Sequence, residues 1–446
     1  MKRLHALLVA ILAVSVCALA AAGQQKAQKL TNRPERERQF MDWGLGIFIH
    51  WGVDSQLGSV ISHSMVGASD EYLDRYISEL PASFNPNRYD PDAWMRLARR
   101  AGARYVVFTT KHHSGFCMWD TDTTEFNVMN TPYGKDVVRQ YVEACREHGL
   151  KVGFYFSPED FHFLHEQGRT IRRRAPYAQV TNNEKLFAYN KRQLDELFGD
   201  YGPIDVCFLD AMEAGPVAQY IHRLQPDCVI TRGEMPTPEQ DIPEPKPGPW
   251  ESCFTMGTQW QFKPTNEEYK SERRLIEMLI ETRAKGGNLL LNVGPTPRGT
   301  IPFEQSRRLR GLGLWMFVNR RAIWDIRPCP TMREGDLWFT RSKDGETVYV
   351  FLTGQEDWSL GERRTFEIRS LRATPDTGIS VLGHNGRVLE YNPDATPEPR
   401  YSQEDGALTL SVVRAQRLYN NRQYPNPVVV KLKNVTFTGE GAGDGG

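Results

Sequence analysis

The feature that most constrains this chain is a regular alternation of apolar, strand-like segments with amphipathic, helix-like segments from Phe40 to about Ile326. Each strand candidate is a nearly continuous apolar run, as expected when both faces of a sheet are covered. Such alternation is typical of a parallel sheet with crossover helices. The candidates are 46–52, 105–113, 152–157, 204–211, 228–234, 251–256 and 288–295. No eighth strand can be placed, but an α/β fold of the (β/α)8-like (TIM) barrel type fits the pattern best.

Beyond Pro328 the pattern changes to short alternating strands. Residues 337–354 predict two strands joined at Asp344-Gly345, and the same turn chemistry recurs at Asn385-Gly386, so two hairpins are expected. Further strand candidates at 408–413 and 428–432 complete a small C-terminal all-β domain. We predict that this domain is a sandwich.

The first residues have the pattern of an export signal. Lys2 and Arg3 precede an apolar run from Leu4 to Leu19, and small residues suited to cleavage follow at 20–23. The run is shorter than the roughly 20 residues of a spanning helix, which makes a retained anchor the weaker alternative. We therefore expect a protein exported to the periplasm or outside the cell, with no membrane span in the mature chain. The expected organisation is a signal peptide at 1–23, the barrel at 30–328, the β-sandwich at 329–437 and a flexible Gly-rich tail at 438–446.

The composition excludes some partners and leaves others open. The formal net charge is zero, which argues against nucleic acid, because phosphate binding needs a basic face. Aromatic residues make up 11% of the chain, enough for a deep core and a site that stacks on sugars. Six cysteines remain after Cys17 leaves with the signal, and without a CxxC pair we expect buried free thiols. The oligomeric state stays open, and a homo-oligomer is compatible with the sequence.

Polar side chains follow five of the strand candidates at their carboxyl ends. These ends carry His50-Trp51, His112-His113, Tyr155, Asp210 and Arg232. In a barrel of this class, the carboxyl ends of the strands surround one mouth, so we expect these groups to converge on an active site. His112 and His113 would point to opposite faces unless the backbone bends there. Asp210 follows an apolar run and would be costly to bury unless it is hydrogen-bonded or used.

An aromatic mouth that contains carboxylates points to carbohydrate. Hydrolysis of a glycoside needs two carboxyl groups, one to attack the sugar or activate water and one to protonate the departing oxygen. Asp210 is the first candidate, and Glu239 and Glu251 are both candidates for the second. A metal-dependent hydrolase built on His50 and the His112-His113 pair is a weaker hypothesis, because adjacent histidines have poor geometry for one ion. We expect no metal and no other cofactor.

The motifs together resemble the α-L-fucosidases of glycoside hydrolase family 29. They are "GLGIFIHWGVDS", "ARYVVFTTKHHSGFCMWDT", "LKVGFYFS", "CFLDA", "TPEQ", "PWESCFTMGTQWQF" and "GGNLLLNVGPTPRGTIP". The likeness runs in unbroken order from about Phe40 to Asp325. It implies a (β/α)8-like catalytic domain followed by a β-sandwich, and a retaining exo-glycosidase that hydrolyses terminal α-L-fucosides of glycans by double displacement.

The resemblance also implies residue roles. By position, Asp210 is the nucleophile and Glu239 is the acid/base, with Glu251 as the second choice. The substrate contacts implied are His50, Trp51, His112, His113, Tyr155, Arg232 and Trp260. Trp260 would pack on the C6 methyl group of the sugar. Neutral imidazoles that donate and accept hydrogen bonds suffice for the hydroxyl groups, so no metal is implied.

Three departures bear on the substrate. Phe208 stands where the family often has Trp, and Ser114 replaces the acid of "KHHDGF". The loop after the first strand reads "LGSVISHSMVGASDEY" and lacks the "GEW"-like triplet whose Glu and Trp grip the sugar. Its role would fall to Ser59, Ser62, His63 or Glu71. A different 6-deoxy sugar, a galactose-configured sugar or a branched linkage is therefore an alternative, and so is a catalytically impaired relative that only binds carbohydrate.

The connection from Pro158 to Asn183 is long and polar. Its arginines are Arg169, Arg172, Arg173 and Arg174. Loops of more than about 12 to 15 residues are usually functional or disordered. We expect this one to cover the site or to contact an anionic neighbouring sugar, with a solvated surface as the alternative.

Overall fold

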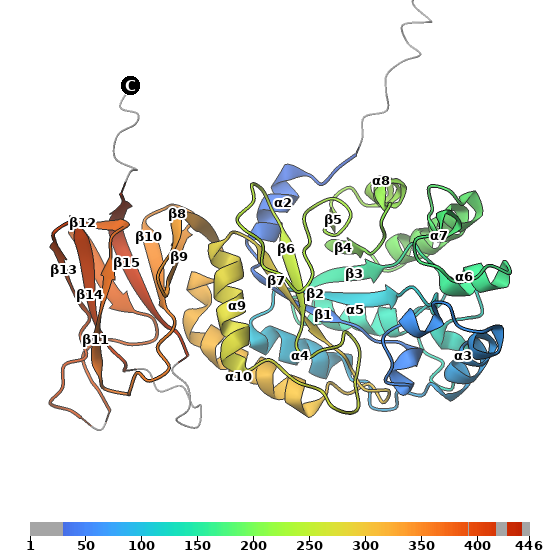
Figure 1. Ribbon diagram of the computed structural model, residues 1–446, viewed down its shortest axis with the longest axis horizontal. Coiled ribbons are helices and arrows are strands. Elements are labelled where there is room, and N and C mark those ends of the chain that lie inside the picture. Colours follow the sequence, from blue (N-terminus) through green and yellow to red (C-terminus); the bar gives the residue numbers. More distant parts are fainter. Residues whose placement is uncertain (1–29, 391, 416–425, 439–446) are drawn as a thin grey trace, which may run out of the picture. The chain divides into compact units, whose positions relative to one another are not determined.

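A computed structural model describes residues 30–390, 392–415 and 426–438 of the protein. Its main sheet has seven parallel strands in the order β5-β4-β3-β2-β1-β7-β6 (Figure 1). The strands are β1 (Leu45–Ile49), β2 (Tyr105–Lys111), β3 (Lys151–Phe156), β4 (Val206–Leu209), β5 (Val229–Ile230), β6 (Glu251–Thr255) and β7 (Asn288–Val293). Five lie within the predicted segments, and β1 and β3 each begin one residue before theirs. The (β/α)8-like barrel is confirmed.

Helices connect the strands and surround the sheet (Figure 1). They are α2 (Pro34–Met41), α3 (Asp70–Ser83), α4 (Pro91–Ala101), α5 (Val137–Glu147), α6 (Phe161–Glu166), α7 (Glu184–Gly199), α8 (Gly215–Leu224), α9 (Glu272–Ala284) and α10 (Phe303–Asn319). Helix α4 shows why they begin and end where they do. The side chain of Asp90 accepts a hydrogen bond from the Ala93 amide at its start, and Gly102 ends it with a positive φ of 92°.

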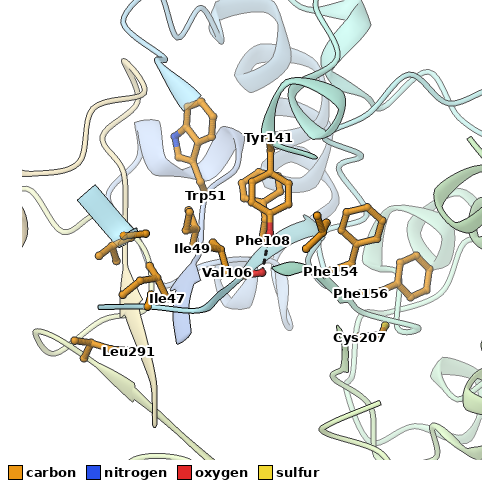
Figure 2. Close-up of a cluster of buried hydrophobic side chains, with 14 of the residues drawn as sticks. Ile47, Ile49, Trp51, Val106, Phe108, Tyr141, Phe154, Phe156, Cys207 and Leu291 are labelled. Carbon is orange, nitrogen blue, oxygen red and sulfur yellow. Dashed lines mark hydrogen bonds between the residues drawn. The ribbon is translucent and has the colours of Figure 1, made fainter. Parts of the chain in front are cut away.

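Alternate residues of each strand point to opposite sides of the barrel wall. In β1, Ile47 and Ile49 belong to the large core between the strands and the helices, which Figure 2 shows in close-up. Phe48 belongs instead to a separate core inside the barrel, together with Tyr155 and Phe208. This alternation decides which residue after each strand end faces the inside.

The eighth position of the barrel is occupied by an irregular segment, Pro236 to Gln240. The amides of Glu251 and Cys253 in β6 donate to the carbonyls of Pro236 and Pro238, and the Gln240 amide donates back to Cys253. A regular parallel ladder would also need donors from the two prolines, which have no N–H. The segment therefore pairs with β6 through half a ladder, with one parallel bridge between Glu239 and Cys253.

The C-terminal part consists of two antiparallel sheets that share one core, as predicted for a sandwich. The larger sheet contains β8 (Ile326–Glu334), β9 (Leu337–Ser342), β10 (Thr347–Leu352), β12 (Leu371–Val381) and β15 (Val428–Phe437). The smaller contains β11 (Arg363–Ile368), β13 (Arg400–Glu404) and β14 (Ala407–Val413). The larger sheet also packs on the barrel helices, because the Trp315 indole donates to the Pro427 carbonyl and its ring lies 6.4 Å from that of Phe351.

One of the two expected hairpins forms. β9 and β10 pair in antiparallel register on either side of Asp344-Gly345. The hairpin expected at Asn385-Gly386 is wrong, because the described residues between β12 and β13 contain no strand. The segment after this turn contains Pro393, Pro397 and Pro399, which cannot supply the amide donors of a second strand.

Other expectations meet the structure only in part. The six cysteines 117, 145, 207, 228, 253 and 329 are free and buried, as expected. β8 begins at Ile326 and so crosses the boundary expected at 328, and the domain limits remain a prediction. The predicted signal peptide and nearly all of the Gly-rich tail lie outside the described residues. Among the residues that are described, no helix is both long and apolar enough to cross a membrane.

Candidate active site

A cavity of about 570 Å³ opens where the carboxyl ends of the strands meet. Its walls come from strands β1, β3, β4 and β6, from residues that follow β2 and β5, from the loop after β1, from the connection after β3 and from the segment around Trp260. The lining residues are Phe48, His50, Val60, His63, His112, Tyr155, Arg173, Phe208, Asp210, Arg232, Glu239, Gln240, Cys253, Thr255, Gly257, Thr258, Gln259, Trp260 and Lys270. Seven of the ten residues singled out from the sequence are among them, and His113 contacts the same group.

Asp210 is held by three side chains at the end of β4. The Tyr155 hydroxyl donates to its Oδ2 at 2.8 Å, and the Arg232 guanidinium donates to its Oδ1 at 3.0 Å. His113 Nε2 lies 3.4 Å from Oδ2. Burial by itself would raise the pKa of this carboxyl, but His113, Arg232 and His112 lower the pKa well below its usual range. Asp210 therefore carries a negative charge although only 19% of its side chain is exposed.

Glu239 is the second carboxyl group of the cavity. The same guanidinium reaches both acids, since Arg232 Nη2 lies 3.0 Å from Glu239 Oε2 while Nη1 binds Asp210. Glu239 is carried on the half-paired segment of the eighth barrel position, and 43% of its side chain is exposed. The two acids thus differ in environment, one enclosed by hydrogen-bond donors and the other open to solvent at the mouth.

His50 is a neutral hydrogen-bonding group. Its Nδ1 lies 2.7 Å from Asn292 Oδ1, and the Asn292 amide nitrogen donates to the Trp260 carbonyl. This assigns Oδ1 as the acceptor for an Nδ1–H of His50, and leaves Nε2 with a free lone pair. Burial lowers the pKa of His50 to about 4, so the ring is uncharged at neutral pH.

His112 is positioned by the loop after β1. Its Nδ1 lies 2.8 Å from the Ser62 hydroxyl, which also accepts the Ser114 amide. Ser62 has a left-handed backbone with φ of 55°, and its own amide donates to the buried carboxyl of Asp54 at 2.7 Å. Burial and the neighbouring histidines lower the pKa of His112 well below 6.5, so it too is neutral.

A bend after β2 brings both adjacent histidines to the site. The pairing of β2 with β3 shifts between Thr109 and Lys111, and the chain turns at Gly115, whose φ is 87°. His112 consequently lines the cavity, while His113 does not line it but contacts Asp210. Lys111 points elsewhere and is fully buried, where Asp160 and two side-chain amide oxygens accept from its ammonium group at 2.7 to 3.2 Å.

Aromatic rings form the floor and one wall of the cavity. The Tyr155 ring stacks on His112 at 5.1 Å and on Phe208 at 5.6 Å. Trp260 is half-buried and lies 5.0 Å from His50. An apolar wall next to polar groups is what a sugar with one apolar face and several hydroxyl groups requires.

Two of the predicted site residues lie elsewhere. Trp51 follows the inward-facing His50 and so points outward, into the same core as Ile47 and Ile49 (Figure 2). Its ring packs there against Phe84 and Trp94. It is 1% exposed, and the expectation that it contacts substrate is wrong. Glu251 is the first residue of β6 and therefore lies at the amino end of the strands, where the Tyr105 hydroxyl donates to it. It does not line the cavity, so it is not placed to act as the acid/base.

The loop after β1 contributes His63 to the cavity, one of four residues that the sequence offered for this role. Ser62 acts through His112, and Ser59 and Glu71 do not line the cavity. Arg173, from the long connection after β3, was singled out only as one of four loop arginines. It lines the cavity with its Nη2 at 3.1 Å from His113 Nε2.

One group in the described part of the chain has three metal-ligand atoms close together. Atoms of His112, His113 and Asp210 lie within 4.8 Å of one another. Arg173 and Arg232 contact members of the same group, and Arg232 and Tyr155 already occupy the two oxygens of Asp210. Two guanidinium groups at this distance disfavour a divalent cation, so the arrangement fits a metal ion poorly.

The model of the alpha-L-fucosidase family matches residues 12–321. The chain belongs to this family. The motif resemblance to glycoside hydrolase family 29 is thereby confirmed, and membership makes the protein a glycoside hydrolase for which the family supports hydrolysis of fucosides.

Similar fucosidases are distant in sequence but alike in fold. The plasma alpha-L-fucosidase of Rattus norvegicus is 28% identical over 388 residues, which cover 78% of this chain and 82% of the rat protein. The alpha-fucosidase structure from Thermotoga maritima is 25% identical with a TM-score of 0.69, and the match covers 90% of this chain and all of that one. The alpha-L-fucosidase of Bacteroides thetaiotaomicron is 22% identical with a TM-score of 0.70 and covers 94% of this chain and 98% of that one, which shows a shared fold.

Proposed function

We propose that the protein is an exported exo-acting α-L-fucosidase that retains anomeric configuration, with Asp210 as nucleophile and Glu239 as acid/base. The observation that carries this proposal is the shared guanidinium of Arg232, which contacts both carboxyl groups at 3.0 Å. Carboxyl groups held this way are compatible with the roughly 5 to 5.5 Å separation of a retaining pair, which leaves no room for a water between the nucleophile and the sugar.

In the first step, a carboxylate oxygen of Asp210 forms a bond to the anomeric carbon as the glycosidic bond breaks. Glu239 gives its proton to the departing oxygen, so the leaving group departs as a neutral alcohol. The low pKa of Asp210 keeps it ionised for this attack. The exposure of Glu239 at the mouth suits an acid that must meet leaving groups of different sizes.

In the second step, Glu239 takes a proton from a water molecule, whose oxygen attacks the anomeric carbon and releases Asp210. Arg232 stabilises whichever carboxylate is ionised, because it contacts both. The Tyr155 hydroxyl remains protonated, since burial and the charge of Asp210 raise its pKa well above 10, and it donates to the carboxylate as that charge returns.

Recognition of the sugar rests on neutral histidines. The free Nε2 lone pair of His50 accepts from a sugar hydroxyl, and the neutral ring of His112 presents its own Nε2 beside it. The rings of these two residues lie 5.8 Å apart, close enough to share one sugar. Trp260 covers the apolar side of the sugar, which in a 6-deoxy sugar includes a methyl group.

The test is Asp210→Gly assayed on 4-nitrophenyl α-L-fucoside. The variant should lose hydrolysis by a factor on the order of 10⁴ or more, and azide should restore release of nitrophenol by forming a fucosyl azide of inverted configuration. Full activity in this variant would refute the mechanism. Binding of fucose in calorimetry without turnover of any fucoside by the wild-type protein would instead show a carbohydrate-binding relative.

A further inference from the structure

Arg173 is held at the cavity without a full set of acceptors. Glu159 is the one carboxylate within 4.0 Å of it among the described residues, and its Oε2 lies 3.6 Å from Arg173 Nε, beyond hydrogen-bond distance. Nε is buried and has no hydrogen-bond partner, and neither does the Oε2 of Glu159. The side chain as a whole is 39% exposed, and Nη2 contacts His113. The part of the guanidinium that faces the open cavity can therefore donate to an oxygen of a ligand.

The acceptor that Arg173 contacts, Nε2 of His113, also lies next to the carboxylate of Asp210. The Ser157 hydroxyl donates to the Glu159 carbonyl, so it accepts from Nδ1–H of His113. Nε2 of His113 lies between a donor, Arg173 Nη2 at 3.1 Å, and an acceptor, Asp210 Oδ2 at 3.4 Å. Arg173 requires a lone pair on this nitrogen, whereas Asp210 requires an N–H, and one nitrogen cannot supply both at once. An anion that bound Arg173 would take its Nη2 donor and leave His113 Nε2 to Asp210 alone.

The remaining wall next to Arg173 contains no acid. The loop after β1 contributes Val60 and His63 to the cavity, while its buried carboxyl, Asp54, is turned to the Ser62 amide. Burial, and then Arg173 and His113, lower the pKa of His63 to about 4, so at neutral pH this ring is an uncharged hydrogen-bonding partner. His63 lies 5.9 Å from His113, ring to ring.

We infer that the sugar bound at Asp210 carries an anionic ester, such as a sulfate, on a ring hydroxyl, and that Arg173 and His63 bind this ester. The inference rests on the proposed function and names its substrate class. A 6-deoxy sugar has a methyl group in place of the C6 hydroxyl or carboxyl, so its anionic forms are esters of ring hydroxyls. Arg173 is close enough to His113 and Asp210 to meet a substituent of the reacting sugar rather than a distant one.

The experiment compares 4-nitrophenyl α-L-fucoside with its 2-O-, 3-O- and 4-O-sulfate esters on the full-length enzyme. One of the sulfated substrates should have a kcat/KM at least about tenfold above that of the unsubstituted fucoside, the effect of one charge-assisted hydrogen bond. R173Q should reduce this preference by about tenfold. R172Q is the matched control, because Arg172 is an exposed neighbour with the same charge, and it should leave the preference unchanged.

The outcomes separate the inference from the proposed function. Hydrolysis of the plain fucoside with weaker or equal hydrolysis of every sulfate ester overturns the inference and leaves the proposed function standing. An equal loss of preference in R172Q and R173Q overturns the role of Arg173. No hydrolysis of any of the four substrates overturns both. The ranking of substrates by the wild-type enzyme decides the substrate class even where R173Q fails to fold.

Discussion

Replacing Glu251 by glutamine tests two conclusions, that Glu251 takes no part in catalysis and that its burial at the amino end of the strands raises its pKa. Glu251 is fully buried, accepts from the Tyr105 hydroxyl through one oxygen and has no partner for the other. Gly46 makes the contact possible, because a Cβ there would lie 2.4 Å from the Tyr105 ring. Burial raises the pKa of Glu251 from 4.5 to about 7, partly offset by the Tyr105 hydroxyl.

The sign of the effect follows from proton linkage. Between pH 4.5 and 7 the folded protein keeps the proton of Glu251 while the unfolded chain loses it, so the free energy of unfolding falls as pH rises. A shift of about 2.5 units at 1.36 kcal/mol per unit amounts to about 3 kcal/mol, lost in full above pH 7. Glu251→Gln does not titrate. Its stability relative to wild type should therefore be about 3 kcal/mol more favourable at pH 8 than at pH 4.5.

Urea unfolding of both proteins at the two pH values measures this difference, because all other titrations cancel between them. Glu251→Gln should also keep most of its activity on an aryl fucoside, whereas the matched variant Glu239→Gln should lose it by about a hundredfold or more. If the difference in unfolding free energy between Glu251→Gln and wild type is the same at both pH values, burial does not raise the pKa of Glu251. Loss of activity equal to that of Glu239→Gln would refute the choice of acid/base.

Three further predictions concern the cavity. The value of kcat/KM should fall below about pH 4, because His50 becomes charged there while Asp210 stays ionised; a pH profile with its acid limb near 6.5 would contradict the burial of His50. Ser62→Ala should lower kcat/KM by about tenfold by releasing His112, with Ser59→Ala as a control that changes little, and equal effects would show that the hydroxyl of Ser62 has no special role. Dialysis against EDTA should leave activity unchanged, since guanidinium groups surround Asp210, and a loss restored by added zinc would revive the metal hypothesis.

Much of the barrel and its site could be predicted because each buried strand is an apolar run whose end is marked by a change to polar residues. A polar residue directly after an apolar run lies at the mouth, and this rule located His50 and Asp210. Two errors came from using the rule incompletely. Alternation places Trp51 outward once His50 faces inward. Glu251 precedes its apolar run rather than following it, which assigns it to the opposite end of the strand.

Other features depend on contacts that no local pattern encodes. The eighth barrel position looked like a loop because Pro236 and Pro238 remove the donors of a strand, although β6 supplies donors to them. The position of Arg173 depends on how a long connection folds back to His113. The bend that turns both His112 and His113 to the site depends on a register shift between β2 and β3, which only the pairing reveals.

The incomplete ladder at the eighth position has a consequence for how the enzyme meets its substrates. A stretch of wall tied to its neighbour by few hydrogen bonds opens locally at lower free energy than the strands around it. Amide exchange should therefore be faster at Gln240 than in the centre of β1. Glu239, the proposed proton donor, lies on this weakly paired segment, whereas Asp210, the proposed nucleophile, directly follows β4, which is paired on both sides. The proposed mechanism would then let the acid adjust to leaving groups of different shape while the position of the attacking carboxylate stays fixed.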